Sequence, residues 1–330
     1  MRVCTAAVIF GLVAGAFADD TPTFRSAISL VKVTADVSHR RSHAPIADLQ
    51  ASDFEVSDEG QKREIVYFEK DSGPLDLLVL LDVSGSVREI LPEIANGAAD
   101  ALAALQPGDR AAVMAFSKTT AVTQPLSGDF RGVAKGIRAA VSIQIGTDTD
   151  INQAVWSATD YLYNAGGTAR RAILILTDNM QETRVPDSLV DEQLSYAGVV
   201  LDGLLFRGAI ALPHVSHPGI LGFARNTGGE VVEGSHPETR VGEMIRRIKL
   251  RYAIHFRPAE STSPRPRRIG VELSGEARSR YPDAVIRARR IYFPFAALRH
   301  KPAILPGAGI ALSNRGAELD KALLLANRKK

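Results

Sequence analysis

A carboxylate and two hydroxyls stand close together at one point of the sequence. Asp82 is followed by Ser84 and Ser86, and residues 75–81, which are apolar apart from Asp76, precede it. Such a run is typical of a strand buried on both faces of a parallel sheet, and ligands of open α/β sheets bind at the carboxyl ends of such strands. The oxygens could therefore hold a hard cation such as Mg²⁺. Alternatively, they could cap the helix that follows.

Two distant stretches bear on this choice. Asp178 ends a second apolar run, residues 172–176, in the same way that Asp82 ends the first, and a polar loop at residues 146–150 precedes a helix expected from Ile151. If the two strands are adjacent and parallel, both carboxylates lie in one crevice. Two carboxylates with several hydroxyls suit Mg²⁺ or Mn²⁺ better than zinc, which favours His and Cys ligands.

The middle of the chain predicts alternating strands and helices, and hence βα units around a mostly parallel sheet. Strands are expected at residues 75–81, 110–116, 172–176, 199–206 and 230–232. Helices are expected at residues 90–105, 129–141, 151–162, 186–197, 219–226 and 238–249.

Both ends of the chain contain further strand patterns. Alternating apolar residues predict strands at residues 28–37, 251–257, 269–273 and 285–293. Short strands near residues 54–56 and 65–68 are expected to pair as a hairpin across residues 58–60. The N-terminal strands are too few to bury a core alone. We therefore expect a small β-module built from both ends of the chain, with the α/β domain inserted between them.

Composition and the first residues indicate an exported globular protein. The chain has 330 residues, 45% of them hydrophobic, which suits one main domain plus a smaller module. Its net charge of +3 implies no general attraction to nucleic acid or anionic membrane. Arg2, the apolar residues 6–13 and the A-x-A triplet at residues 16–18 are typical of a secretory signal cleaved after Ala18. A membrane anchor or a buried first strand is the alternative, but the apolar stretch is shorter than the roughly 20 residues of a spanning helix. Cys4, the only cysteine, would leave with that peptide.

Enzymatic and nucleic-acid functions find little support. No G-x-S-x-G motif surrounds Ser84, so a serine hydrolase is not expected. His214 and His217 have ligand-like spacing but no acidic or thiol neighbour. The basic stretches at residues 265–268 and 287–290 lack interleaved aromatic residues, and we interpret them as solvated strand faces.

The three oxygen-rich segments, in this order, resemble the metal-ion-dependent adhesion site of the von Willebrand factor type A (vWA) domain. They read D-x-S-x-S from Asp82, T-D-I-N-Q-A-V from Thr149 and L-T-D ending at Asp178. The resemblance spans residues 73–235 and implies a doubly wound, mostly parallel sheet with helices on both faces. The flanking stretches DFEVSDEGQKREI and IRRIKLRYAIHFRP are similar to those of secreted bacterial vWA-related proteins.

The resemblance also implies a set of metal ligands. Ser84 and Ser86 would bind Mg²⁺ directly through their hydroxyls, with Mn²⁺ or Ca²⁺ as alternative ions. Asp82 would bind through water, and Asp178 would bind through water or support the ligands from behind. The sixth position would take a carboxylate from a protein partner.

Two residues are candidates for the threonine ligand, and two other positions depart from the family pattern. Thr149 is expected as the ligand because T-x-I and the later Ala154 match that pattern, and Thr147 is the alternative. Asn179 and Asp148 stand where glycine is common in the family. An extra carboxylate at Asp148 could tighten cation binding but repel an acidic partner.

These observations predict a non-enzymatic, exported protein that is secreted or periplasmic. It would bind a protein partner in adhesion or interaction through its metal site. The alternative is a structural or assembly factor of the cell envelope whose metal site is unused. The expected parts are a signal peptide (1–18), an N-terminal β segment (24–72), a vWA-like domain (73–235), a C-terminal helix and β segment (236–296) and a peripheral tail (297–330). The sequence leaves the identity of the partner and the oligomeric state open.

Overall fold

The structure, a computed structural model, describes residues 30–71, 73–143, 145–146, 148–180, 185–206, 218–234, 237–261, 263 and 265–294. The expected signal peptide, the tail, Thr147 and the His214–His217 pair lie outside these ranges. Within them, no helix is long and apolar enough to cross a membrane.

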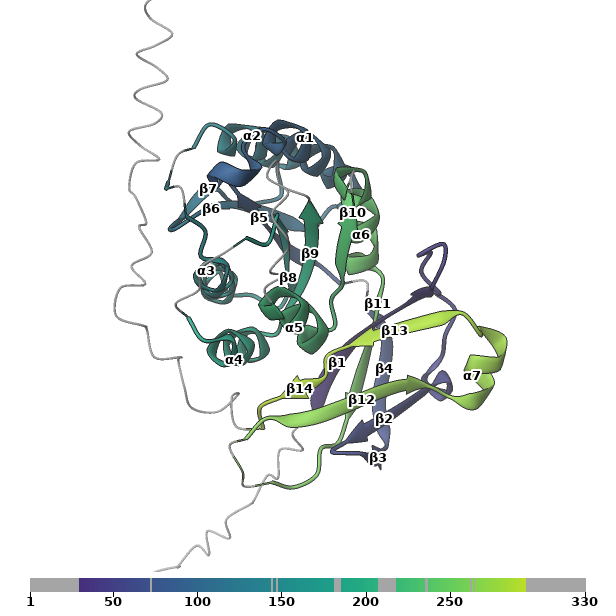
Figure 1. Cartoon of the computed structure of the whole chain (residues 1–330). Coiled ribbons are helices and arrows are strands. Elements are labelled where there is room, and N and C mark those ends of the chain that lie inside the picture. The colour runs from purple at the N-terminus through teal and green to yellow at the C-terminus, as the bar shows by residue number, and fades with distance from the viewer. Residues whose placement is uncertain are drawn as a thin grey trace, which may run out of the picture.

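A six-stranded sheet forms the centre of the larger unit (Figure 1). Its order is β10-β9-β8-β5-β6-β7, and every neighbouring pair is parallel except β6 and β7. The strands are β5 (Leu75–Asp82), β6 (Arg110–Phe116), β7 (Thr120–Ser127), β8 (Arg170–Thr177), β9 (Val199–Phe206) and β10 (Val231–Gly234). The apolar run of β5 therefore forms a central strand, as predicted. The sequence did not reveal β7, because this edge strand is only partly buried and its residues do not alternate clearly.

Three helices cover each face of this sheet, as the doubly wound fold requires (Figure 1). On one face lie α1 (Leu91–Ala101), α2 (Phe130–Ala140) and α6 (Val241–Lys249). On the other lie α3 (Ile151–Asn164), α4 (Asp187–Ala197) and α5 (Pro218–Thr227). Successive residues of β5 point to opposite faces, so Val79 packs in the first core and Leu80 in the second. Short 3₁₀ turns complete this unit at η2 (Gly85–Val87), η3 (Leu102–Ala104) and η4 (Pro237–Arg240).

The two ends of the chain form the expected β-module, which consists of two antiparallel sheets. One sheet has the order β13-β1-β11-β4, with β1 (Val31–His39), β4 (Ile65–Asp71), β11 (Arg251–Phe256) and β13 (Ala284–Ala288). The other has the order β14-β12-β2-β3, with β2 (Phe54–Asp58), β3 (Gln61–Arg63), β12 (Arg267–Leu273) and β14 (Ile291–Tyr292). Their facing sides share one hydrophobic core, which includes Val33, Val56 and Phe256. Two short helical segments, η1 (Ala51–Asp53) and α7 (Gly275–Arg280), complete the module.

The predicted hairpin is wrong in its second strand. β2 pairs with β3 across Glu59 and Gly60, both in the left-handed region, whereas residues 65–68 belong to β4 and pair with β11. The chain changes sheets between β3 and β4, and it does so again between β13 and β14, where one long strand was expected. Alternation of apolar residues shows which side faces a core but not which strand lies alongside.

Buried ion pairs join the β-module to the larger unit. Arg247 of α6 contacts Asp36 of β1 at 2.7 Å and also pairs with Glu230, which precedes β10. Arg287 of β13 pairs with the same two carboxylates. The interpretation of residues 287–290 as a solvated strand face is therefore wrong at Arg287. It is likewise wrong at Arg267 in the other basic stretch, because that side chain pairs with the buried Asp58.

Candidate functional site

The candidate site lies where β5, β6 and β8 end on the same side of the sheet. Leu81 of β5 is paired with Leu176 of β8, and Asp82 is paired with Phe116 of β6. The loops that follow these strands, together with the loop before α3, therefore converge at one edge. Adjacent parallel strands therefore place Asp82, at the end of β5, close enough to Asp178, directly after β8, for the two carboxylates to interact electrostatically.

Asp82 is completely buried, and both of its carboxylate oxygens already accept hydrogen bonds. The backbone amide of Ser84 donates to Oδ1 at 2.9 Å, and the Thr177 hydroxyl donates to Oδ2 at 2.6 Å. Burial raises the pKa of the Asp82 carboxyl to about 6, although both hydrogen-bond donors act in the opposite direction. A cation at this site would therefore compete with a proton in mildly acidic solution.

The two serine hydroxyls lie next to each other, with 3.2 Å between the Oγ atoms of Ser84 and Ser86. Ser84 is buried and Ser86 is partly exposed. Neither hydroxyl caps the following helix, because α1 has Ile90 at its N-cap and no side-chain capping bond there. Ser84 also makes no side-chain capping bond to η2. The capping interpretation is therefore wrong for the serines, and their oxygens remain together in the loop that follows β5.

Asp178, which interacts electrostatically with Asp82, has one unsatisfied oxygen. Its Oδ1 accepts a hydrogen bond from the Met180 amide at 3.2 Å, whereas Oδ2 is buried and has no hydrogen-bond partner among the described residues. A buried polar atom without a partner costs free energy.

Asn179 has φ 59°, a left-handed conformation that Asn tolerates better than most residues. This explains why Asn can stand where the family commonly has glycine.

The loop before α3 is held against the end of β6. The Asp150 amide donates to the Ser117 carbonyl at 3.0 Å, and a Cβ on Gly146 would lie 3.1 Å from Ser117 Oγ. The Asp150 carboxylate caps α3 by accepting a hydrogen bond from the Gln153 amide at 3.0 Å. Thr149, one residue earlier, is buried. The close packing of Gly146 thus fixes the loop that carries the predicted threonine ligand.

Residues 77–181 match the von Willebrand factor type A domain family. The chain contains a vWA domain. Such domains often mediate protein interactions and can carry a metal-ion-dependent adhesion site. A search of curated proteins found no match.

Several solved structures are similar to this chain. One is BatB from Bacteroides thetaiotaomicron, with 14% identity, a TM-score of 0.45 and coverage of 53% of this chain and 97% of that one. An aerotolerance-related membrane protein from Bacteroides fragilis has 14% identity, a TM-score of 0.42 and coverage of 53% and 98%. Proximal thread matrix protein 1 from the mussel byssus, described with a zinc-occupied metal-ion-dependent adhesion site motif, has 15% identity, a TM-score of 0.40 and coverage of 55% and 48%.

The additional acidic residues of the vWA domain are largely compensated. Asp148 Oδ2 lies 3.3 Å from Lys118 Nζ in an exposed ion pair. An exposed pair contributes little to stability, but it offsets the charge that Asp148 adds near the crevice. Asp150 faces the amides at the start of α3, where a negative charge is favourable. Repulsion of an acidic partner is therefore weaker than the sequence suggests.

The donor set of the vWA domain suits a hard divalent cation. Within the described ranges, no three His, Cys, Asp or Glu side chains gather in a group that could hold a metal ion. The candidate ligands are instead two carboxylates and the hydroxyls of Ser84, Ser86 and Thr149, all of them oxygen donors. The unsatisfied Asp178 Oδ2 fits a cation or its bound water.

Two further polar residues at the ends of these strands were not singled out from the sequence. Thr177 anchors Asp82 and also accepts a hydrogen bond from the Asn179 amide at 3.1 Å. Ser117 follows β6, and its buried Oγ has no hydrogen-bond partner in the described part of the chain. Both residues directly follow or end a strand beside β5, and a search for polar residues at strand ends would have found them.

Proposed function

We propose that this chain is an exported protein-binding module that captures a carboxylate of a protein partner through Mg²⁺, without catalysing a reaction. The observation that carries the proposal is the pair of serine hydroxyls, 3.2 Å apart, beside two buried carboxylates at the ends of adjacent strands. The proposal extends the vWA assignment to a specific ligand chemistry.

Each oxygen has a role in this proposal. Ser84, Ser86 and Thr149 would bind the cation directly through neutral hydroxyls. Asp82 would act through water, because its two oxygens hold hydrogen bonds from Ser84 and Thr177. Asp178 Oδ2, which lacks a partner within the described residues, would accept a hydrogen bond from metal-bound water. Mn²⁺ and Ca²⁺ are the second choices on the same donor chemistry.

Neutral direct ligands explain why the partner should be acidic. A Mg²⁺ ion bound directly by hydroxyls alone keeps much of its positive charge, and a carboxylate is the natural group to complete its coordination. Lys118, which pairs with Asp148, offsets the negative charge that Asp148 would otherwise present to such a carboxylate. A protein side chain of Asp or Glu is the proposed ligand, and nucleic acid is not.

Calorimetric titration of the purified chain with Mg²⁺ and Mn²⁺ tests the metal site. Saturable binding is expected for the wild type, with strong weakening in Asp82→Ala and Ser84→Ala. Ser279→Ala is a matched control, because Ser279 is exposed on α7 in the β-module. The absence of binding to the wild type, or equal binding by Asp82→Ala, would refute the metal site.

The structural alternative requires a different test. The β-module has its own core and is joined to the vWA domain by buried ion pairs that include none of the proposed metal ligands, so it would keep its structure when no metal is bound. A pull-down from envelope extract, with and without EDTA, separates the two functions. Partner capture that is lost in EDTA supports the metal-dependent function, and capture that survives EDTA supports the structural one.

Export is part of the same proposal and rests on the first residues of the sequence. If residues 1–18 are a cleaved signal, the mature chain begins at Asp19. Mass spectrometry of the protein isolated from a periplasmic or secreted fraction should give that N-terminus. An intact N-terminus on protein from those fractions would contradict cleavage.

A further inference from the structure

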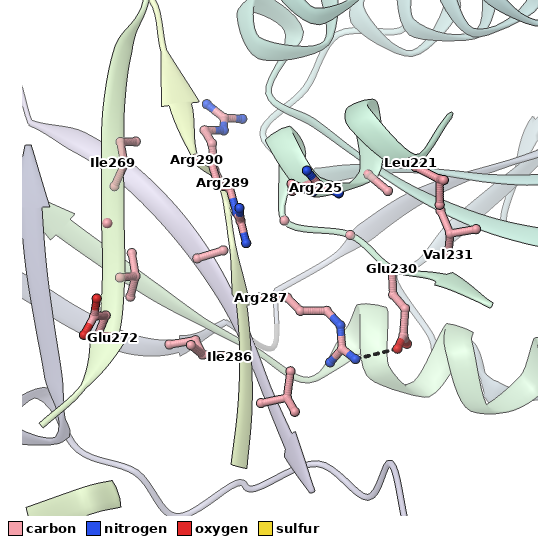
Figure 2. A pocket seen from close by; sticks show the side chains of 17 residues that line it. Leu221, Arg225, Glu230, Val231, Ile269, Glu272, Ile286, Arg287, Arg289 and Arg290 are labelled. Carbon is pink, nitrogen blue, oxygen red and sulfur yellow. Dashed lines mark hydrogen bonds and ion pairs between the residues drawn. The ribbon is translucent and has the colours of Figure 1, made fainter. Parts of the chain in front are cut away.

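A groove of about 700 Å³ lies where the vWA domain meets the β-module. One wall is formed by α5 and the segment that enters β10, and the other by β12, β13 and the residues that follow β13 (Figure 2). Its volume falls within the range of roughly 300–1,000 Å³ that is usual for ligand sites, and such sites occur preferentially between domains.

The walls of the groove are fixed to each other. Gly228 has φ +83°, and a Cβ there would lie 2.6 Å from the carbonyl carbon of Ala288. The Arg290 amide donates to the Asn226 carbonyl at 3.0 Å. Arg287 bridges the groove to Glu230 (Figure 2). The groove is therefore preformed, and a ligand would not pay for ordering its walls.

Three arginines give the groove an unbalanced positive charge. Arg225 projects from α5, and Arg289 and Arg290 follow β13 on the opposite wall (Figure 2). In the described part of the chain, none of these three guanidinium groups forms a hydrogen bond or ion pair with a carboxylate. The acidic residues of the lining are already engaged, because Glu230 pairs with Arg287 and Glu272 pairs with Arg278.

Arg289 is the most informative of the three. Burial lowers the pKa of its guanidinium, and no carboxylate among the described residues offsets that burial. Its Nη2 lies 3.9 Å from a Cβ built on Gly198, the C-cap of α4, so the C-terminal end of α4 is close by. The C-terminus of a helix carries only about half a negative charge. This is too little to balance three guanidinium groups.

We propose that this groove is a second binding site, which takes an acidic, extended segment of a protein partner. The arginines come from separate elements on both walls, so they suit several carboxylates spaced along a chain better than a single small anion. Apolar side chains that also line the groove, including Leu221, Val231 and Ile286, would contact the aliphatic parts of such a segment. Arginine pairs with carboxylates in a bidentate geometry and is common in interfaces.

The site is independent of the metal site, and the experiment keeps the two apart. The full chain is freed of metal on a chelating resin and titrated into a fluorescein-labelled hexaglutamate peptide, with fluorescence polarisation as the readout. Saturable binding that weakens with salt is expected. Arg289→Gln and Arg225→Gln should each weaken it by about tenfold, the effect of losing one charged hydrogen bond. Because Arg225 is exposed, its variant should fold normally.

Arg131→Gln is the matched control, since Arg131 is exposed on α2, away from the groove, and its replacement removes the same charge. Its binding should equal that of the wild type. The proposal is overturned if the metal-free chain does not bind the peptide, or if Arg131→Gln weakens binding as much as Arg289→Gln. It is also overturned if inorganic phosphate displaces the peptide at equal ionic strength, because the groove would then be a small-anion site.

Discussion

Replacing Asp82 by Asn should stabilise the metal-free protein and at the same time remove Mg²⁺ binding. Asp82 is fully buried, and burial raises the pKa of its carboxyl from the ordinary 3.8 to about 6. Above pH 6 the folded protein has to keep this buried group ionised. The difference between the two pKa values corresponds to about 3 kcal/mol of folding free energy. Asn has nearly the same shape and no charge, so the variant avoids this cost.

The raised pKa of Asp82 also predicts how the stability difference between Asp82→Asn and the wild type changes with pH. Because the pKa of Asp82 is raised in the folded state, the stability that this group contributes is present below about pH 4 and is lost as the pH rises through about 6. The Asn variant has no such loss. The free energy of unfolding of the variant, relative to the wild type, should therefore increase by about 2.5 kcal/mol between pH 4 and pH 7.5.

Urea denaturation in EDTA measures this difference, with the fluorescence of Trp156 as the signal. Trp156 is the only tryptophan and is buried on α3. Adding Mg²⁺ at about 100 times its dissociation constant should then stabilise the wild type by about 2.7 kcal/mol and leave Asp82→Asn unchanged. Asp148→Asn removes the same charge at an exposed position and should shift stability by no more than about 0.5 kcal/mol. A relative stability that stays constant with pH, or an equal gain from Mg²⁺ in the Asn variant, would refute the reasoning.

Three further predictions concern the β-module and its junction with the vWA domain. Arg247→Met removes a buried cation from two carboxylates and should lower the free energy of unfolding by about 3 kcal/mol, measured by thermal denaturation. The control Arg138→Met removes an exposed ion pair and should change the free energy of unfolding little. Gly228→Ala introduces a Cβ at a residue with positive φ and against the backbone of Ala288 in β13. The substitution should lower the free energy of unfolding by about 1–3 kcal/mol. A thermal midpoint equal to that of the wild type would contradict the close approach of Gly228 to Ala288. Burial raises the pKa of Asp58, but hydrogen bonds and the charge of Arg267 outweigh it and keep the pKa below 3.8. The wild type should therefore lose stability as the pH falls below about 4, and Asp58→Asn should show a flatter loss in melting curves between pH 3 and pH 7.

Much of the vWA domain could be predicted because its strands are buried on both faces. The apolar runs of β5 and β8 stand out in the sequence, and each ends at the point where its carboxylate appears. The strands of the β-module were harder to assign, because alternation is equally compatible with several neighbours. The pattern at residues 65–68 therefore predicts pairing with β2, whereas β4 pairs with β11 in the structure.

The sequence by itself determined the identity of the candidate metal ligands. Asp82, Ser84, Ser86 and Asp178 lie within short local motifs at strand ends, and local patterns are what a single sequence displays. The tertiary structure decided how these oxygens are used. Thr177 and the Ser84 amide occupy both oxygens of Asp82, while one oxygen of Asp178 is left unsatisfied within the described residues.

The groove could be found only in the tertiary structure. Arg225 lies far from Arg289 and Arg290 in the sequence, and the latter two belong to a basic stretch that reads as a solvated strand face. Their common location depends on the packing of α5 against the end of β13, which the close approach at Gly228 allows. The three arginines lie close together because distant segments of the chain are in contact. The hydrophobic periodicity of a sequence does not show which distant segments will be in contact.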